Sequence, residues 1–118
     1  MSDTAMFIGW GTAVHNREEQ ATMVFTQASA YRKKLQNADD IESYDVFMLE
    51  PHCTDLTGFA VLKGHTQHLG NVHTSEAFQK LVTRANLVVK GFCVVNATSC
   101  NAAAEQIGMS ASMAVSID

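Results

Sequence analysis

The pattern of apolar and polar residues along the chain predicts four strands and two main helices. Ala5 to Val14 (AMFIGWGTAV) is apolar and aromatic and ends at a polar break, as is typical of a strand. Gly9 and Gly11 fall on one face of this segment, where missing side chains would let a helix or a ligand come close. We therefore expect a first strand over residues 5–14.

The next segment predicts a long helix. Asn16 is a candidate N-cap, and Glu19 stands three residues later in the position of a capping box. Glu18 and Glu19 at the start, and Arg32 to Lys34 at the end, complement the helix dipole. Apolar residues recur at three- and four-residue spacing, which indicates one buried stripe. The stripe consists of Ala21, Val24, Phe25, Ala28, Tyr31 and Leu35.

Two strands and a loop are expected after this helix. Residues 37–40 (NADD) end the helix, and the β-branched and aromatic content of Ile41 to Glu50 predicts a second strand. Pro51 ends that strand, so PHCTDLTG (51–58) is expected to form a loop. Gly58 to Lys63 (GFAVLK) is the predicted third strand, near enough in sequence for an antiparallel hairpin with the second.

The remaining chain predicts a short helical turn, a second long helix, a fourth strand and a tail. The turn begins at His65 and breaks near Gly70, and Thr74 or Ser75 caps the helix that follows. Leu87 to Ala97 (LVVKGFCVVNA) is the predicted fourth strand. The stripe of the second long helix consists of Phe78, Leu81, Val82 and Ala85.

The order β-α-β-β-α-β predicts an α+β, ferredoxin-like domain over residues 1–100, with an antiparallel sheet and two helices on one face. Both faces of the sheet are expected to be apolar, because Phe47 and Leu49 alternate with Val46 and Met48 in the second strand. Helices can cover only one face, so a second copy of the chain is the simplest cover for the other. We predict a homodimer, with the apolar tail (101–118) packed on a neighbouring surface, most simply the partner subunit.

Composition narrows the class of partners and the compartment. The net charge is −4 and no long basic run occurs, so a nucleic-acid partner is not expected. No apolar run approaches the ~20 residues of a membrane span, so no membrane partner is expected either. The sequence begins without a signal-peptide pattern, and its 3 cysteines form no C-x-x-C pair. A cytoplasmic location is therefore expected.

One run of residues resembles a known superfamily. In VHTSEAFQKL (72–81), His73, Ser75 and Phe78 match a pattern of the proteins related to antibiotic-biosynthesis monooxygenases, within the dimeric α/β-barrel superfamily. The segments GWGT (9–12) and LEPH (49–52) are similar to those of small uncharacterised bacterial proteins. The resemblance covers residues 5–97 and implies the dimeric ferredoxin-like fold. It leaves activity open, because such proteins range from cofactor-free oxygenases to haem binders and isomerases.

The histidines do not predict a metal site. On one helix, His68 and His73 would stand about 140° apart, too far to share an ion with His65. Zinc motifs use tighter spacing and usually a cysteine or carboxylate partner. The cluster is more typical of a solvated surface segment, and the resemblance singles out only His73 for a role in a pocket.

A second polar cluster, His52, Cys53 and Asp55, lies in the predicted loop. A cysteine beside a histidine can be an activated thiol, but adjacent side chains usually point apart. A turn with incidental His and Cys residues is the simpler interpretation. Cys93, inside an apolar strand, is expected to serve packing.

Aromatic residues suggest a pocket between sheet and helices. We predict that Trp10, Phe25, Tyr44 and His73 line it, although core or dimer packing explains the aromatic residues equally well. Three classes of function remain: a small-molecule-binding dimer for an apolar or aromatic ligand, a cofactor-independent oxygenase-like enzyme, or a haem binder. In the second class, His73 would move protons near neutral pH, with His52 as a second candidate for this role. Haem is disfavoured because no histidine is marked as an axial ligand, so we expect no cofactor.

Overall fold

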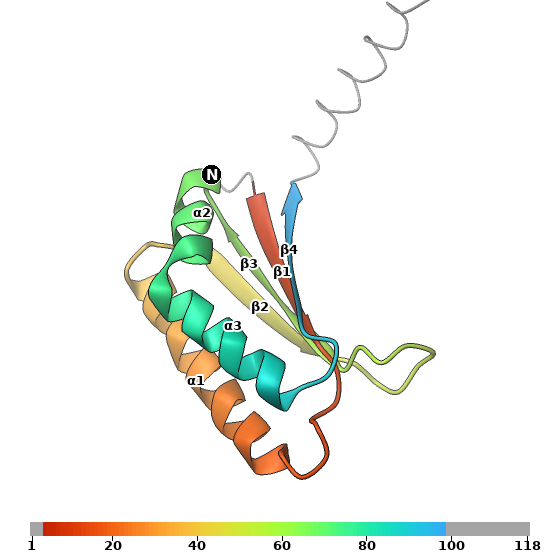
Figure 1. Ribbon diagram of the computed structural model, residues 1–118. Coiled ribbons are helices and arrows are strands. Elements are labelled where there is room, and N and C mark those ends of the chain that lie inside the picture. The colour runs from red at the N-terminus through yellow and green to blue at the C-terminus, as the bar shows by residue number, and fades with distance from the viewer. Residues whose placement is uncertain (1–3, 99–118) are drawn as a thin grey trace, which may run out of the picture.

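The computed structural model describes residues 4–98, which form a four-stranded sheet and three helices (Figure 1). The predicted order is confirmed, with one further helix before the last long one. The tail (101–118) and the domain boundary at residue 100 lie outside the described residues. In chain order the elements are β1 (Thr4–Trp10), α1 (Glu18–Asn37), β2 (Ser43–Met48), β3 (Gly58–Gly64), α2 (Thr66–Thr74), α3 (Glu76–Val88) and β4 (Cys93–Thr98).

The sheet is antiparallel throughout, and its strand order is β2-β3-β1-β4. The predicted hairpin of β2 and β3 is confirmed, with Phe47 opposite Phe59. β1 lies between β3 and β4, so Ile8 is opposite Ala60 on one side and Val94 on the other. Because successive side chains of a strand point to opposite faces, this register determines which residues share a face.

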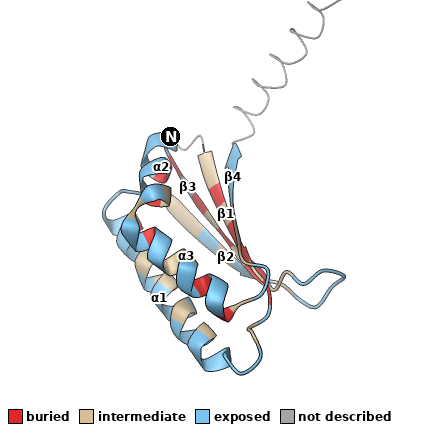
Figure 2. Cartoon of the chain, viewed as in Figure 1, coloured by how far each residue is buried: buried red, intermediate tan, exposed pale blue. Residues whose placement is uncertain are grey.

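Helices α1 and α3 lie together across one face of the sheet (Figure 1). The core forms between them and the sheet, where Met6, Leu62 and Ile41 are almost completely buried. Leu35 from α1 and Phe78 from α3 join this core. Figure 2 shows buried segments on the strands and on α2 and α3. Each such side chain contributes about 1.5–3 kcal/mol through removal of apolar surface from water.

The opposite face of the sheet has no helix over it in residues 4–98 (Figure 1). Phe7, Phe47 and Phe59 form an aromatic row there, in which both neighbouring pairs of ring centroids are 5.1 Å apart. Val95 stands opposite Phe7 on the same face and is 52% exposed. Val46 and Met48 point to the helix side by register with Ala60 and Gly58. The expectation of a sheet with two apolar faces is therefore confirmed. We call the uncovered side the open face.

The predicted break at Gly70 is wrong, because α2 continues through this residue to Thr74. Glycine costs a helix about 0.5–1 kcal/mol relative to alanine. Burial of Leu69 and Val72 against the sheet offsets that cost. A Cβ added at Gly70 would point into open space. The backbone of Gly70 is therefore held in the helix by the packing of its neighbours.

The predicted start of the fourth strand at Leu87 is also wrong. Leu87 and Val88 belong to α3, and β4 begins only at Cys93. Val88 extends the stripe of Leu81 and Ala85 by one more turn and is buried. An apolar run alone does not distinguish a buried helix end from a strand. Here Leu87 and Val88 continue the helix, because Val88 lies on its buried stripe.

The start of α1 differs from the predicted capping box. Arg17 takes the N-cap position with no side-chain cap hydrogen bond, and the helix begins at Glu18. Asn16 has a φ of 68°, in the left-handed region that asparagine tolerates, so it turns the chain instead of capping it. The Arg17 guanidinium donates to the Leu87 carbonyl, which ties this turn to the end of α3.

The first strand ends at Trp10, earlier than predicted. Gly11 donates its N–H to the Lys90 carbonyl, and a Cβ at this position would lie only 2.6 Å from that oxygen. Gly9 is closely surrounded by the side chains of Phe7, Leu56 and Cys93. The glycines therefore admit neighbouring strand and loop atoms, and the expected close approach of a helix or ligand is not what fills these positions.

Candidate ligand-binding cavity

A cavity with room of about 80 Å³ for the centres of water-sized molecules lies between the sheet, α1 and α3. Its wall is almost entirely apolar. Small-molecule sites typically have apolar walls with few polar groups. It is lined by Ile8, Trp10, Ala21, Val24, Phe25, Ala28, Tyr31, Arg32, Leu62, Phe78, Leu81, Val82, Ala85, Val88, Val89 and Phe92.

The stripes predicted for the two long helices supply most of this wall. Each stripe combines large side chains with alanines, and Ala21, Ala28 and Ala85 all face the cavity. Alanine favours the helix but fills little space between the layers. The larger residues of each stripe therefore pack the helices against the sheet, and the alanines leave space for the cavity between the layers.

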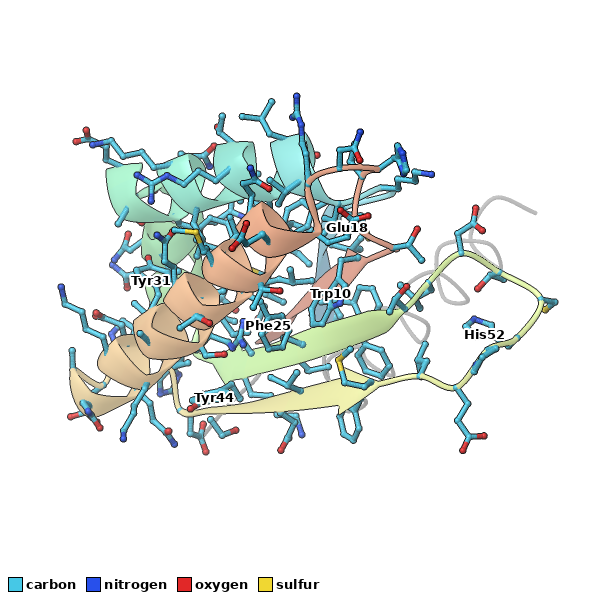
Figure 3. The ribbon with its side chains drawn as sticks, turned by 90° about the horizontal axis from the view of Figure 1, so that it is seen from below. Trp10, Glu18, Phe25, Tyr31, Tyr44 and His52 are labelled. Carbon is cyan, nitrogen blue, oxygen red and sulfur yellow. The ribbon has the colours of Figure 1, made fainter. Side chains whose placement is uncertain are left out.

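Trp10 and Phe25 form the aromatic end of the cavity. Their ring centroids lie 5.7 Å apart with the planes at 77°, an edge-to-face arrangement that aromatic pairs favour. Trp10 ends β1 and Phe25 projects from α1, so the contact joins sheet and helix (Figure 3). Phe25 remains 40% exposed, which leaves part of its ring open to solvent. Both residues line the cavity, and their role in binding a ligand stays a prediction.

Arg32 also lines the cavity, and it is the one charged residue among its lining. Only 6% of its surface is exposed, and its guanidinium carbon lies 5.8 Å from the centre of the Tyr44 ring. One Nη donates to the Ser29 hydroxyl at 3.1 Å, whereas the buried Nε has no partner among the described residues. Burial lowers the pKa of Arg32 from its usual value, and the interaction with Tyr44 partly opposes that shift.

The burial of Arg32 was not predicted, because its place near the helix end indicated only a favourable interaction with the helix dipole. The sequence did carry a signal: Arg32 stands four residues after Ala28 and three before Leu35, on the apolar stripe itself. The prediction instead grouped Arg32 with Lys33 and Lys34 as cations of the last helical turn. Both lysines are indeed exposed.

Ser75 fixes the start of α3 and links it to α1. Its hydroxyl accepts from the Phe78 N–H at 3.3 Å, which confirms one of the two predicted caps. The same oxygen lies 3.4 Å from the Tyr31 hydroxyl and 2.7 Å from the Val72 carbonyl, to which it donates. The cap therefore holds α2, α3 and α1 in register beside the cavity.

Tyr44 and His73 do not line this cavity. Tyr44 contacts Arg32, which does line the cavity. The His73 ring lies 5.7 Å from the Phe78 ring, and Phe78 does line the cavity, so one aromatic side chain stands between. The Nδ1 atom of His73 is buried and has no hydrogen-bond partner within residues 4–98. The structure thus places His73 behind the cavity wall.

The other candidate groups lie apart from the cavity. The loop that carries His52, Cys53 and Asp55 projects beyond the sheet, and all three are exposed (Figure 3). The His52 ring is held locally by the Glu50 carbonyl and the Thr54 hydroxyl. His65 and His68 meet edge to face, but no group of three potential ligands that could hold a metal ion occurs in the described part of the chain. None of the described helices is long and apolar enough to cross a membrane.

No protein family profile matches the sequence, and no curated protein matches it as a relative. Solved structures do resemble it. A dimeric ferredoxin-like protein of unknown function from Jannaschia sp. CCS1 is 7% identical, with 81% of this chain and 98% of that chain covered at a TM-score of 0.63. A variant of SnoaB, a cofactor-independent oxygenase from Streptomyces nogalater, is 13% identical, with 83% and 94% covered at 0.59.

A further similar structure belongs to an enzyme of different chemistry. The hydroxynitrile lyase from Passiflora edulis is 11% identical, with 82% of this chain and 94% of that chain covered at a TM-score of 0.63. At such identities a shared structure establishes the fold and leaves activity open. The chain has the ferredoxin-like fold of these proteins.

Proposed function

We propose that the protein is a homodimer that binds a small apolar or aromatic molecule in the cavity between α1, α3 and the sheet. The observation that carries the ligand half of this proposal is the cavity itself, with its apolar wall and the Trp10–Phe25 pair. Planar ligands gain from contact with aromatic walls, because stacking adds to the gain from burial. Few polar groups interrupt the wall, so a strongly hydrophilic ligand would lose more hydration than it recovers.

The dimer half of the proposal rests on the open face. Phe47 on β2 is 49% exposed and Val95 on β4 is 52% exposed, so the apolar row reaches both edge strands of the sheet. Contiguous apolar patches of this kind mark interaction sites, and the simplest partner for a sheet face is a second copy of it. Similar structures from Bacteroides fragilis and Jannaschia are dimeric ferredoxin-like proteins, which supports the same arrangement here.

Ligand binding is testable by thermal unfolding and titration calorimetry with naphthalene-based compounds. A ligand at a hundred times its Kd should stabilise the protein by about 2.7 kcal/mol. Ala28→Leu should abolish this gain, because Ala28 lines the cavity and the larger side chain fills it. Ala30→Leu, which adds the same side chain at an exposed position of α1, is the matched control. Equal binding by both variants would place the ligand elsewhere.

A second candidate function is that of a cofactor-independent oxygenase acting on a small aromatic substrate. The similarity to SnoaB favours it. In this proposal His73 accepts a proton from the substrate, after a movement of Phe78 that opens the wall between them, and His52 is an additional candidate acid–base group. The movement is required because Phe78 lines the cavity, 5.7 Å from the His73 ring, whereas His73 does not line it.

The two functions are separated by turnover. An oxygenase should consume oxygen when given a dihydroxynaphthalene, whereas a binding protein should be stabilised by the compound without oxygen uptake. His73→Ala should remove the uptake, and His68→Ala, an exposed histidine of α2, should leave it unchanged. Loss of uptake in His52→Ala as well would assign the loop a part in the reaction. No uptake by the unaltered protein would exclude this candidate for that substrate class.

A further inference from the structure

The cavity contains a buried positive charge whose neutralising partner is missing from the described residues. Only 6% of the Arg32 surface is exposed, yet no carboxylate lies within ion-pair distance of this side chain in residues 4–98. The one ion pair in this range joins Lys80 and Glu76 on the surface of α3. Buried charges in proteins are almost always paired, because an unpaired one loses its hydration without compensation.

The hydrogen bonds of Arg32 are equally incomplete. A guanidinium has five N–H donors, and the Ser29 hydroxyl accepts from one of them. The Tyr44 ring supplies a favourable cation–π contact but accepts no full charge. The buried Nε–H has no acceptor within residues 4–98. A group arranged in this way is prepared for a planar anion, which can accept two parallel hydrogen bonds from Nε and Nη.

The position of Arg32 relative to the aromatic end indicates the size of such a ligand. Arg32 and Phe25 are seven residues apart on α1, which corresponds to about 10 Å along the helix axis. The sheet separates the two ends in the same direction. Trp10 pairs with Gly58 of β3, and Tyr44, which contacts Arg32, pairs with Leu62, four residues further along β3. The two ends of the cavity therefore differ in chemistry: aromatic at Trp10 and Phe25, cationic at Arg32.

We infer that the ligand is an acid: a flat apolar or aromatic body of about two rings that carries a carboxylate or equivalent anionic oxygen group. The anionic group pairs with Arg32, and the body lies against Trp10 and Phe25. This inference rests on the proposed ligand-binding function and specifies its ligand class. It also explains why a charged residue occupies a stripe position that is otherwise apolar.

The test compares two probes of the same shape, 2-naphthoate and 2-naphthylmethanol, by titration calorimetry. The acid should bind the unaltered protein about tenfold to a hundredfold more tightly than the alcohol, as expected for a charge-assisted hydrogen bond. Arg32→Gln should remove this preference while leaving the affinity for the alcohol nearly unchanged. Lys33→Gln, which removes the adjacent but exposed charge, should keep the preference.

A measurement on the unaltered protein guards against a variant that fails to fold. The ¹H–¹⁵N resonance of the Arg32 side-chain Nε–H should shift when 2-naphthoate is added, and should move much less with 2-naphthylmethanol. Equal affinities for the two probes, or a preference that survives Arg32→Gln, would overturn the acid inference and leave the binding cavity standing. Failure of both probes to bind would overturn the proposed ligand-binding function, and the acid inference with it.

Discussion

The rings of Phe47 on β2 and Phe59 on β3 lie 5.1 Å apart on the open face of the sheet. Phe7 of β1 stacks against Phe59 from the other side, so three strands contribute to one aromatic row. Exposure of this row to water is unfavourable, because burying each ring fully would contribute about 1.5–3 kcal/mol to stability. It is the part of the proposed interface where a charge should act most strongly.

Phe47→Glu should convert the dimer into a monomer, because association would then bury an unpaired carboxylate on each side. Sedimentation velocity at micromolar concentration measures the change. Met23→Glu is the control: Met23 is 59% exposed on α1, away from the open face, so the dimer should persist. A Phe47→Glu protein that still sediments as a dimer would show that the open face is not the interface.

Arg32→Met should raise the free energy of unfolding by about 1–2 kcal/mol when no ligand is present. The replacement keeps a long flexible side chain in the cavity wall but removes a buried, incompletely hydrogen-bonded charge. A residue kept for binding often costs stability in this way. Urea unfolding gives the comparison. A less stable Arg32→Met protein would mean that Arg32 holds the fold together through Ser29 and Tyr44.

Two glycines should respond oppositely to alanine. Gly70→Ala should stabilise the protein by about 0.4–1 kcal/mol, because the residue is helical and an added Cβ meets nothing within 4 Å. Gly91→Ala should destabilise it by about 1–2 kcal/mol, because Gly91 has a φ of 62° and L residues are strained there. Chemical unfolding of both variants tests the pair, and a destabilised Gly70→Ala would contradict a helix continuing through residue 70.

Ser75→Ala should lower the free energy of unfolding by about 1–2 kcal/mol. It removes the cap of α3 and the polar link to Tyr31 together. The neighbouring Thr74→Ala should change stability by less than about 0.5 kcal/mol, because its exposed hydroxyl only donates back to helix carbonyls. If the two variants were equally stable, the Ser75 cap would contribute little to the fold.

The local patterns of the sequence were sufficient for most elements and for their faces. The spacing in α1 and α3 predicted which side of each helix meets the sheet, and alternation in β2 predicted that both sheet faces are apolar. Ser75 was among the expected caps because a cap depends on residues within one turn. Trp10 and Phe25 were placed at one pocket because each belongs to a strongly patterned segment.

Where segments meet, only the tertiary structure could decide. Whether residues 87–92 continue a helix or begin a strand depends on what Val88 packs against, and α2 passes through Gly70 because the sheet buries Leu69 and Val72. His73 stands behind Phe78 and not in the cavity, a relation that no spacing encodes. The sequence shows that residue 32 is a charged arginine, but its burial depends on how the helices pack on the sheet. Periodicity is a property of one segment, so the sequence was enough to predict the elements of the fold. Burial is a property of the packed layers, so the chemistry of the cavity was decided only by the tertiary structure.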